Sequence, residues 1–260
     1  AARLNLPRLP ARLVIIGGGY IGVEFSSIYA SFGSKVTILQ DGDVFLPRED
    51  EEIAGAVRES LESRGIHVMT GVRVKALEQA EGRALVVVDT GKEVQKLEAE
   101  AVLVATGRRP NTAGLNLEAA GVQVGPRGGI VTDDSLTTTA PHIYAMGDVR
   151  GGLQFTYISL DDFRIVKSKV LGDGSYTLKK RGAVPYSVFL IPPFSRVGLS
   201  EKEAVEKGYK VKIARLAAAA IPKAQVLEQP AGLLKAVIDE ETGLILGAHL
   251  FCQESYEMIN

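Results

Sequence analysis

Three glycines near the start of the chain have the spacing of a phosphate-binding turn. They form the pattern Gly17-x-Gly19-x-x-Gly22, directly after the apolar run Leu13–Ile16 and at the start of a helical pattern. In such a motif the first glycine permits a tight turn, the second lets the backbone approach a pyrophosphate, and the third lets helix and strand pack closely. Free N–H groups at the helix N-terminus favour the phosphates. The spacing and its context predict a dinucleotide site.

Gln40 occupies the position where such a site usually has an acidic residue. A carboxylate about 20 residues after the fingerprint, at the end of the second strand, binds the ribose hydroxyls of NAD. Here Gln40 is followed by Asp41, and the next arginine is Arg48. Gln40 can hydrogen-bond a ribose but carries no charge to reject a 2′-phosphate, and no cation stands at this strand end to bind one. We expect a modest preference for NADH over NADPH; the alternative is that Gln40 is an ordinary exposed strand end.

Three further positions each allow a functional and a structural interpretation. Glu24, placed on the expected first helical turn, either complements the helix dipole or contacts the nicotinamide end of the cofactor. Thr106-Gly107 either leaves room for a cofactor at a strand end or forms a plain turn. Asp148 follows an apolar run and Gly147. It either accepts hydrogen bonds from a polyol such as the flavin ribityl chain or caps a helix.

These residues need an α/β framework, and residues 13–105 alternate strand and helix signals. A βαβαβ unit with an inserted antiparallel meander is predicted, which is a Rossmann-like dinucleotide fold. Strands are expected at Leu13–Ile16, Lys35–Leu39, Ile66–Met69 and Ala101–Ala105, helices at Tyr20–Phe32 and Glu51–Arg64, and the meander at Val72–Leu77, Ala84–Val88 and Glu93–Leu97, with a turn at 90–92.

The second part of the chain changes character. Residues 106–150 are rich in Gly, Pro, Asn and Thr, and 172–184 is typical of a linker or an exposed loop. Residues 185–260 predict a separate α+β domain, because Ser200 to Glu203 forms a capping box before three strand patterns. The expected elements are a buried strand at Ile143–Met146, a helix near Phe155–Leu171, and strands at Tyr209–Leu216, Leu233–Asp239 and Ile245–Phe251.

Composition excludes several classes of protein. The 260 residues carry a net charge of −1, which gives no basic surface for nucleic acid or an anionic membrane. No apolar run approaches a membrane span. A single cysteine, Cys252, cannot form an intrachain disulfide or a four-ligand zinc site, so we expect a buried thiol, no metal site and a reducing, cytoplasmic location. The chain begins Ala-Ala and ends within an amphipathic segment, so we also expect a piece of a longer protein.

Four ordered motifs carry a family resemblance over nearly the whole chain. They are G-G-G-Y-I-G-V-E (17–24), A-T-G-R-R-P-N (105–111), A-M-G-D (145–148) and P-P-F-S-R-V-G-L-S-E-K-E-A (192–204). In one register they resemble the class I pyridine nucleotide–disulfide oxidoreductases. The segment Leu153–Val166 is most similar to the mercuric-reductase-like branch that includes the reactive-chlorine-resistance flavoproteins.

The resemblance implies two cofactor sites and three domains. The domains would be 1–109 for NAD(P), 110–172 as the second segment of an FAD domain, and 185–260 as a truncated dimerisation domain that makes a homodimer. The family's first FAD-binding segment and its redox-active cysteine pair have no match here, its C-terminal His–Glu pair should lie beyond Asn260, and no catalytic residue is expected in this chain. The NAD(P) site would be lined by Gly17, Gly18, Gly19, Tyr20, Ile21, Gly22, Val23, Glu24, Gln40, Val74 and Gly107, and FAD would contact Asp148, Gln154, Phe155, Thr156 and Tyr157.

The implied activity of the parent protein is transfer of a hydride from NAD(P)H to FAD, and then to a disulfide, a metal ion or a similar small acceptor. Two alternatives stay open. The chain is a fragment that binds dinucleotide and dimerises without chemistry, or the parent is a flavin NADH oxidase or peroxidase with a related nucleotide domain.

Overall fold

The computed structural model describes residues 6–80 and 82–260. The predicted start of the nucleotide domain at residue 1 lies outside them. The chain divides into two compact units, each taken by itself below. The first combines residues up to Gly107 with Pro185–Asn260, and the second is Arg108–Val184. The segment predicted to dimerise therefore shares a compact unit with the predicted nucleotide domain.

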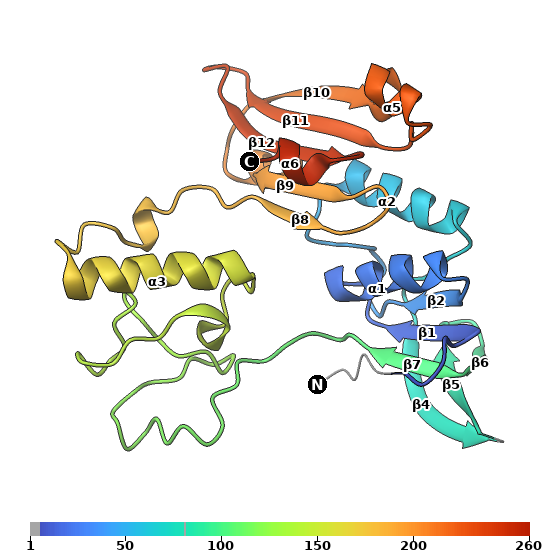
Figure 1. The fold of residues 1–260 in the computed structure, drawn as a ribbon, viewed down its shortest axis with the longest axis horizontal. Coiled ribbons are helices and arrows are strands. Elements are labelled where there is room, and N and C mark those ends of the chain that lie inside the picture. Colours follow the sequence, from blue (N-terminus) through green and yellow to red (C-terminus); the bar gives the residue numbers. More distant parts are fainter. Residues whose placement is uncertain (1–5, 81) are drawn as a thin grey trace. The chain divides into compact units, whose positions relative to one another are not determined.

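A parallel sheet forms the centre of the first unit. Its strands run in the order β3-β2-β1-β7, joined by helices that follow β1 and β2 (Figure 1). Successive residues of β1 alternate between two cores: Leu13 and Ile15 pack with the helices, whereas Val14 packs on the opposite face. Both faces are thus covered, as parallel sheets require. The elements are β1 (Arg12–Ile16), α1 (Tyr20–Ser31), β2 (Lys35–Leu39), α2 (Glu51–Ser63), β3 (His67–Met69) and β7 (Ala101–Val104), close to the predicted bounds.

The predicted meander is confirmed and covers one face of this sheet. Strands β4 (Arg73–Ala80), β5 (Arg83–Asp89) and β6 (Val94–Ala99) pair antiparallel in that order. Val86 and Val88 of β5 are fully buried and share a core with Val14 and Leu39. The turn at 90–92 is closed by a bond from the Thr90 N–H to the Glu93 carbonyl.

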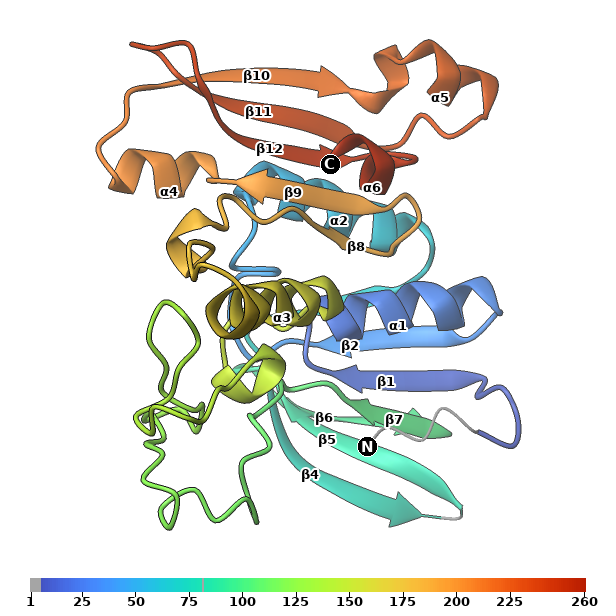
Figure 2. The same ribbon diagram turned by 60° about the vertical axis from the view of Figure 1, so that its left-hand side comes forward.

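A second, antiparallel sheet has the order β10-β11-β12-β9-β8 (Figure 2). The capping box is confirmed: the Ser200 hydroxyl accepts from the Glu203 N–H, while the Glu203 carboxylate accepts from the Ser200 N–H. Two strands, β8 and β9, were not predicted, because they are short and flanked by prolines. The elements are β8 (Tyr186–Val188), β9 (Phe194–Gly198), α4 (Glu201–Glu206), β10 (Val211–Ala217), α5 (Pro222–Val226), β11 (Leu233–Asp239), β12 (Ile245–Phe251) and α6 (Ser255–Met258).

Helix α2 joins the two sheets of the first unit. Its buried stripe of Ile53, Val57 and Leu61 belongs to the same core as Phe194 of β9 and Phe251 of β12. Figure 2 shows α2 running beside β8 and β9. The loops at the start of α2 therefore lie where the nucleotide-domain sheet and the 185–260 sheet meet.

The second unit contains one long helix and irregular chain. Helix α3 (Thr156–Leu171) confirms the predicted helix, and short 3₁₀ turns, η1 and η2, cover Gly147–Arg150 and Leu178–Lys180. The strand predicted at Ile143–Met146 is wrong. In the described part of the chain this segment pairs only at Tyr144, in an isolated bridge to Thr137, and Met146 is largely exposed. A strand needs several paired residues on a neighbour, which this segment lacks here.

Candidate functional site

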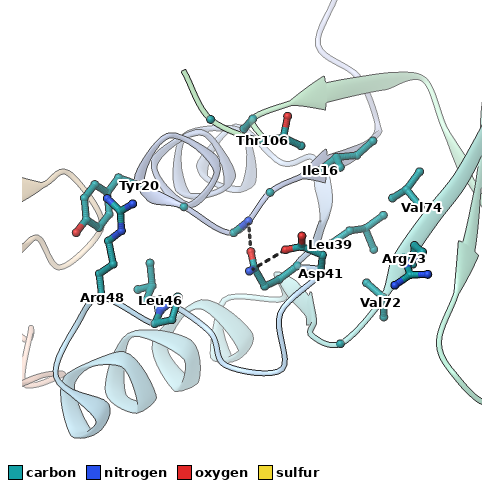
Figure 3. A pocket seen from close by; sticks show the side chains of 18 of the residues that line it. Ile16, Tyr20, Leu39, Asp41, Leu46, Arg48, Val72, Arg73, Val74 and Thr106 are labelled. Carbon is teal, nitrogen blue, oxygen red and sulfur yellow. Dashed lines mark hydrogen bonds between the residues drawn. The ribbon is translucent and has the colours of Figure 1, made fainter. Parts of the chain in front are cut away.

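A cavity of about 890 Å³ opens at the carboxyl ends of β1, β2 and β7 (Figure 3). This is the edge at which parallel α/β sheets bind their ligands. Figure 3 shows Tyr20 and Arg48 at one side of the cavity and Arg73 and Val74 at the other. The lining residues are Ile16, Gly17, Gly18, Gly19, Tyr20, Leu39, Gln40, Asp41, Leu46, Pro47, Arg48, Gly71, Val72, Arg73, Val74, Asp89, Gly91, Ala105, Thr106 and Gly107.

The three glycines of the fingerprint meet different surroundings. Gly17 has φ of +110°, and a β-carbon there would lie 2.4 Å from the Ala105 carbonyl oxygen. At Gly22 a β-carbon would lie 2.0 Å from the Gly17 oxygen, so helix and turn are in direct contact. At Gly19 nothing lies within 4 Å, and this residue caps α1 without any side-chain acceptor. The open approach to a helix N-terminus at Gly19 is a cradle that fits a phosphate.

Gln40 closes the turn from the end of β2. Its Oε1 accepts the Gly18 N–H at 2.9 Å, and its Nε2 donates to Asp41 Oδ1 at 3.2 Å. Asp41 also accepts the Gly42 N–H at 2.9 Å and is exposed. The amide of Gln40 is therefore engaged with the turn, and the exposed carboxylate at this strand end belongs to Asp41.

The structure brings part of the predicted nucleotide set together. Gly17, Gly18, Gly19, Tyr20, Gln40, Val74 and Gly107 line the cavity. The rest of the predicted set is absent from the lining. Of these, Gly22 and Val23 are buried against β1, and Ile21 is exposed.

Glu24 is held away from the helix end. Helix α1 begins at Tyr20 and carries no acidic residue in its first turn, so the predicted placement of Glu24 there is wrong. Its carboxylate accepts the Phe189 N–H at 2.9 Å instead. Glu24 thus ties α1 to the chain after β8, a contact that local sequence signals do not contain.

Several charged residues of the cavity were not assigned to the site from sequence. Arg73 and Asp89 face each other across the β4–β5 pair, and their place depends on the register of that meander. Arg48 enters from the loop between β2 and α2. The local signal for Arg73 and Asp89 was their position at the ends of predicted strands, and Arg48 had no such signal.

A buried polar cluster lies behind Tyr20. Its hydroxyl donates to Glu49 Oε1, and the Tyr186 hydroxyl donates to the same oxygen at 2.8 Å. Nη1 of Arg196 lies 3.4 Å from Oε2 of Glu49, and the same guanidinium also pairs with Glu203. Burial, reinforced by the Glu49 charge, raises the pKa of both phenols well above the ordinary value, so both remain donors.

The predicted flavin residues lie in the second unit. Asp148 is in η1 with its side chain half exposed, and Arg108 contacts both its carboxylate, at 3.2 Å, and the Gln154 carbonyl, at 2.8 Å. Phe155 and Tyr157 stack with ring centroids 5.4 Å apart at the start of α3, where Thr156 is the first helical residue. Asp148 and the 154–157 segment are thus fixed together by one arginine.

Asp162 of α3 holds the turn that carries Asp148. Its carboxylate is fully buried, accepts the Gly147 N–H at 2.7 Å, and pairs with Arg150 and Arg181. Residues 6–80 and 82–260 contain no cluster of three His, Cys, Asp or Glu side chains able to hold a metal ion, and no helix that is both long and apolar enough to cross a membrane.

Comparison with known families agrees with this geometry. Residues 1–162 match the family model described as pyridine nucleotide-disulphide oxidoreductase, and residues 184–260 match the model of its dimerisation domain. The chain belongs to the pyridine nucleotide-disulphide oxidoreductase family, whose members are oxidoreductases.

Individual relatives show how much of such a protein the chain spans. The chain is 49% identical over 257 residues to RclA of Escherichia coli K12, a probable pyridine nucleotide-disulfide oxidoreductase. The matched region covers 99% of this chain and 57% of RclA. A mercuric reductase of Staphylococcus aureus is 38% identical over 256 residues, and the match covers 98% of this chain and 47% of that reductase. The chain therefore spans about half the length of the curated relatives it matches.

Solved structures support the same assignment. E. coli RclA, described as an HOCl-induced flavoprotein disulfide reductase, superposes with a TM-score of 0.94, covering 99% of this chain and 58% of that chain. LpdA of Mycobacterium tuberculosis is 28% identical and superposes with a TM-score of 0.88. The match covers 98% of this chain and 55% of the LpdA chain. The predicted fold class is confirmed.

Proposed function

We propose that this chain supplies the pyridine-nucleotide site, part of a flavin site and a dimerisation surface of an FAD-dependent oxidoreductase. The observation that carries the proposal is the cavity at the ends of β1, β2 and β7, with open space at the Gly19 cap. Its glycine cradle suits the pyrophosphate of NAD(P)H. A bound nicotinamide supplies the hydride, and the chain's own residues bind and orient it.

Each part of the nucleotide has a matching surface in the cavity. The pyrophosphate would lie at Gly17–Gly19 and the adenosine ribose at Gln40 and Asp41, with the nicotinamide end toward Thr106 and Gly107. The exposed Asp41 carboxylate suits a ribose diol and repels a 2′-phosphate, which supports a preference for NADH. Of the family positions, Ile21, Gly22, Val23 and Glu24 would act by holding α1 rather than by touching the nucleotide.

The flavin would be held by the second unit. Asp148 would accept hydrogen bonds from the ribityl chain, and Gln154, Phe155, Thr156 and Tyr157 would contact the cofactor from the start of α3. The half-exposed Asp148 carboxylate and the exposed Tyr157 are accessible to such a ligand, which supports the proposal. The proposed division of the two sites is 1–109 for NAD(P) and 110–172 for FAD.

The electron acceptor is proposed from the relatives. One is a mercuric reductase, another is a dihydrolipoyl dehydrogenase of Geobacillus stearothermophilus, and RclA is described as a disulfide reductase and as a Cu(II) complex. A disulfide or a metal ion is therefore the proposed acceptor of the whole protein, which would work as a homodimer through 185–260. With one cysteine in this chain, a cytoplasmic location is proposed as well.

NADH titration by calorimetry tests the nucleotide site. Gly19→Val fills the open space that the pyrophosphate needs, and we expect its affinity for NADH to fall at least about tenfold, or ~1.4 kcal/mol. Gly55→Val is the matched control, because Gly55 lies on α2 with open space around it and does not line the cavity. Unchanged NADH affinity in folded Gly19→Val would overturn the assignment.

A further inference from the structure

Tyr20 belongs to two environments at once. It lines the nucleotide cavity at the first position of α1, and its hydroxyl donates to Glu49. Glu49 lies in the loop between β2 and α2, and its side chain is fully buried. The orientation of this cavity-wall phenol is therefore set by a carboxylate that solvent does not reach.

Glu49 is fixed from the far side by residues of the 185–260 segment. Tyr186 of β8 donates to Oε1 at 2.8 Å, and Arg196 of β9 lies 3.4 Å from Oε2. Arg196 also donates to the Arg48 carbonyl at 2.5 Å and pairs with Glu203 in the α4 capping box. Side chains of the second sheet thus hold both the Arg48 backbone and the Glu49 carboxylate of one cavity-lining loop.

The electrostatics keep this arrangement intact. Arg196 is buried between Glu49 and Glu203, and although burial opposes its charge, the nearby Tyr186 and both carboxylates raise the pKa of the guanidinium. A buried carboxylate that accepts two phenol hydroxyls and faces an arginine has little freedom to reorient. The phenol of Tyr20 is consequently pre-set before any ligand arrives.

We propose that Glu49 is a positioning residue, which sets nucleotide affinity by holding Tyr20 in the cavity wall and so links the 185–260 segment to the nucleotide site. The proposal rests on the proposed NADH site. A wall fixed in advance loses less conformational freedom when the ligand binds, so loosening Tyr20 weakens binding. The effect travels through one side chain, which makes it separable from general destabilisation.

A double-mutant cycle isolates this route. Glu49→Gln and Tyr186→Phe are each measured with Tyr20 present and in a Tyr20→Phe background, using NADH binding to the whole chain by calorimetry. We expect each to weaken binding about fivefold when Tyr20 is present and to have no effect in the Tyr20→Phe background. Tyr186→Phe keeps the test valid if the charge lost in Glu49→Gln prevents folding. Tyr209→Phe, in the same segment before β10, is the matched control and should bind like wild type.

The outcomes separate the two proposals. Equal losses in both backgrounds, or unchanged or tighter binding in the single variants, would overturn the positioning role of Glu49 while NADH binding by wild type stands. No NADH binding by wild type would overturn the proposed nucleotide site, and the positioning role with it.

Discussion

The ammonium of Lys235 lies 2.9 Å from Oδ1 of Asp50, and both side chains are almost fully buried. Lys235 is in β11 of the 185–260 sheet, and Asp50 caps the N-terminus of α2. The same ammonium reaches Glu52 at 2.8 Å and Glu201 at 2.6 Å. Burial opposes its charge, but the bonds to these carboxylates raise the pKa of Lys235. One buried cation thus contacts three carboxylates where the two sheets meet.

Without the Lys235 cation, the first unit should unfold at a lower concentration of denaturant. Lys235→Met leaves the buried Asp50 carboxylate without a cation, although Arg215 still pairs with Glu52 and Glu201, and we expect a loss of about 3–5 kcal/mol in the free energy of unfolding. The exposed pair of Lys210 and Glu241 gives the control: Lys210→Met should cost less than about 1 kcal/mol. Guanidinium unfolding measures both. Similar losses in the two variants would refute the role of Lys235.

Two glycine-to-alanine changes in neighbouring helices should have opposite effects. At Gly22 the new methyl would meet the Gly17 carbonyl, so Gly22→Ala should destabilise by about 1–3 kcal/mol. At Gly55 the methyl enters open space in a helix interior, so Gly55→Ala should stabilise by about 0.5–1 kcal/mol. Thermal unfolding of both variants checks the difference. A neutral Gly22→Ala would show that the turn can move away from the helix.

His249 should make stability depend on pH. It is fully buried in β12, between Arg196 on β9 and Lys235 on β11, and its Nε2 contacts the Leu199 carbonyl at 3.0 Å. Burial and the Arg196 charge lower the pKa of His249, against the Leu199 bond and the carboxylates of Asp50 and Glu49. The unfolded chain therefore binds a proton near pH 6.5 that the folded chain does not, and stability falls as the pH drops below about 6.5.

Urea unfolding at several pH values between about 5.5 and 8 tests this sign. His249→Gln removes the titrating group, so its stability should change less across that range than that of wild type. The carboxylates with lowered pKa, such as Glu52 and Glu203, lose their contribution only at lower pH and do not confuse the comparison. Parallel profiles for the two proteins would contradict the prediction.

The choice between NADH and NADPH should respond to charge at the end of β2. Gln40→Glu places a carboxylate beside Asp41 while keeping an acceptor for the Gly18 N–H. We expect the preference for NADH to increase about tenfold, because a second negative charge repels a 2′-phosphate. Dissociation constants for NADH and NADPH give the ratio. A wild-type preference for NADPH, or an unchanged ratio in the variant, would reject this account of Gln40.

Local signals predicted most elements of the first unit. The bounds of β2, β11 and β12 agree with prediction, because alternating or continuous apolar runs end there in turn residues. Strands β8 and β9 were missed because β9 exists through pairing with β12, which is distant in the chain, and β8 exists through pairing with β9. The prediction of a strand at Ile143–Met146 was wrong for the opposite reason. Its apolar run suits a strand, but only Tyr144 pairs with a residue of another segment.

The candidate site divides in the same way. Gly17, Gly19 and Gln40 belong to a local strand–turn–helix pattern, so the sequence placed them at one cavity. Arg73 and Glu49 could not be placed, because their neighbours are fixed by the β4–β5 register and by the return of the chain at residue 185. Long-range pairing leaves no mark in the spacing of nearby residues.

The split of the first unit across the sequence has a consequence for biosynthesis. When residue 107 leaves the ribosome, the apolar stripe of α2 still lacks Phe194 and Phe251, and residues 108–184 must be made first. During that interval the stripe is open to chaperones or to other nascent chains. Contacts of such long sequence separation also slow folding. We therefore expect the N-terminal segment to stay unfinished until nearly the last residue of β12 has been translated.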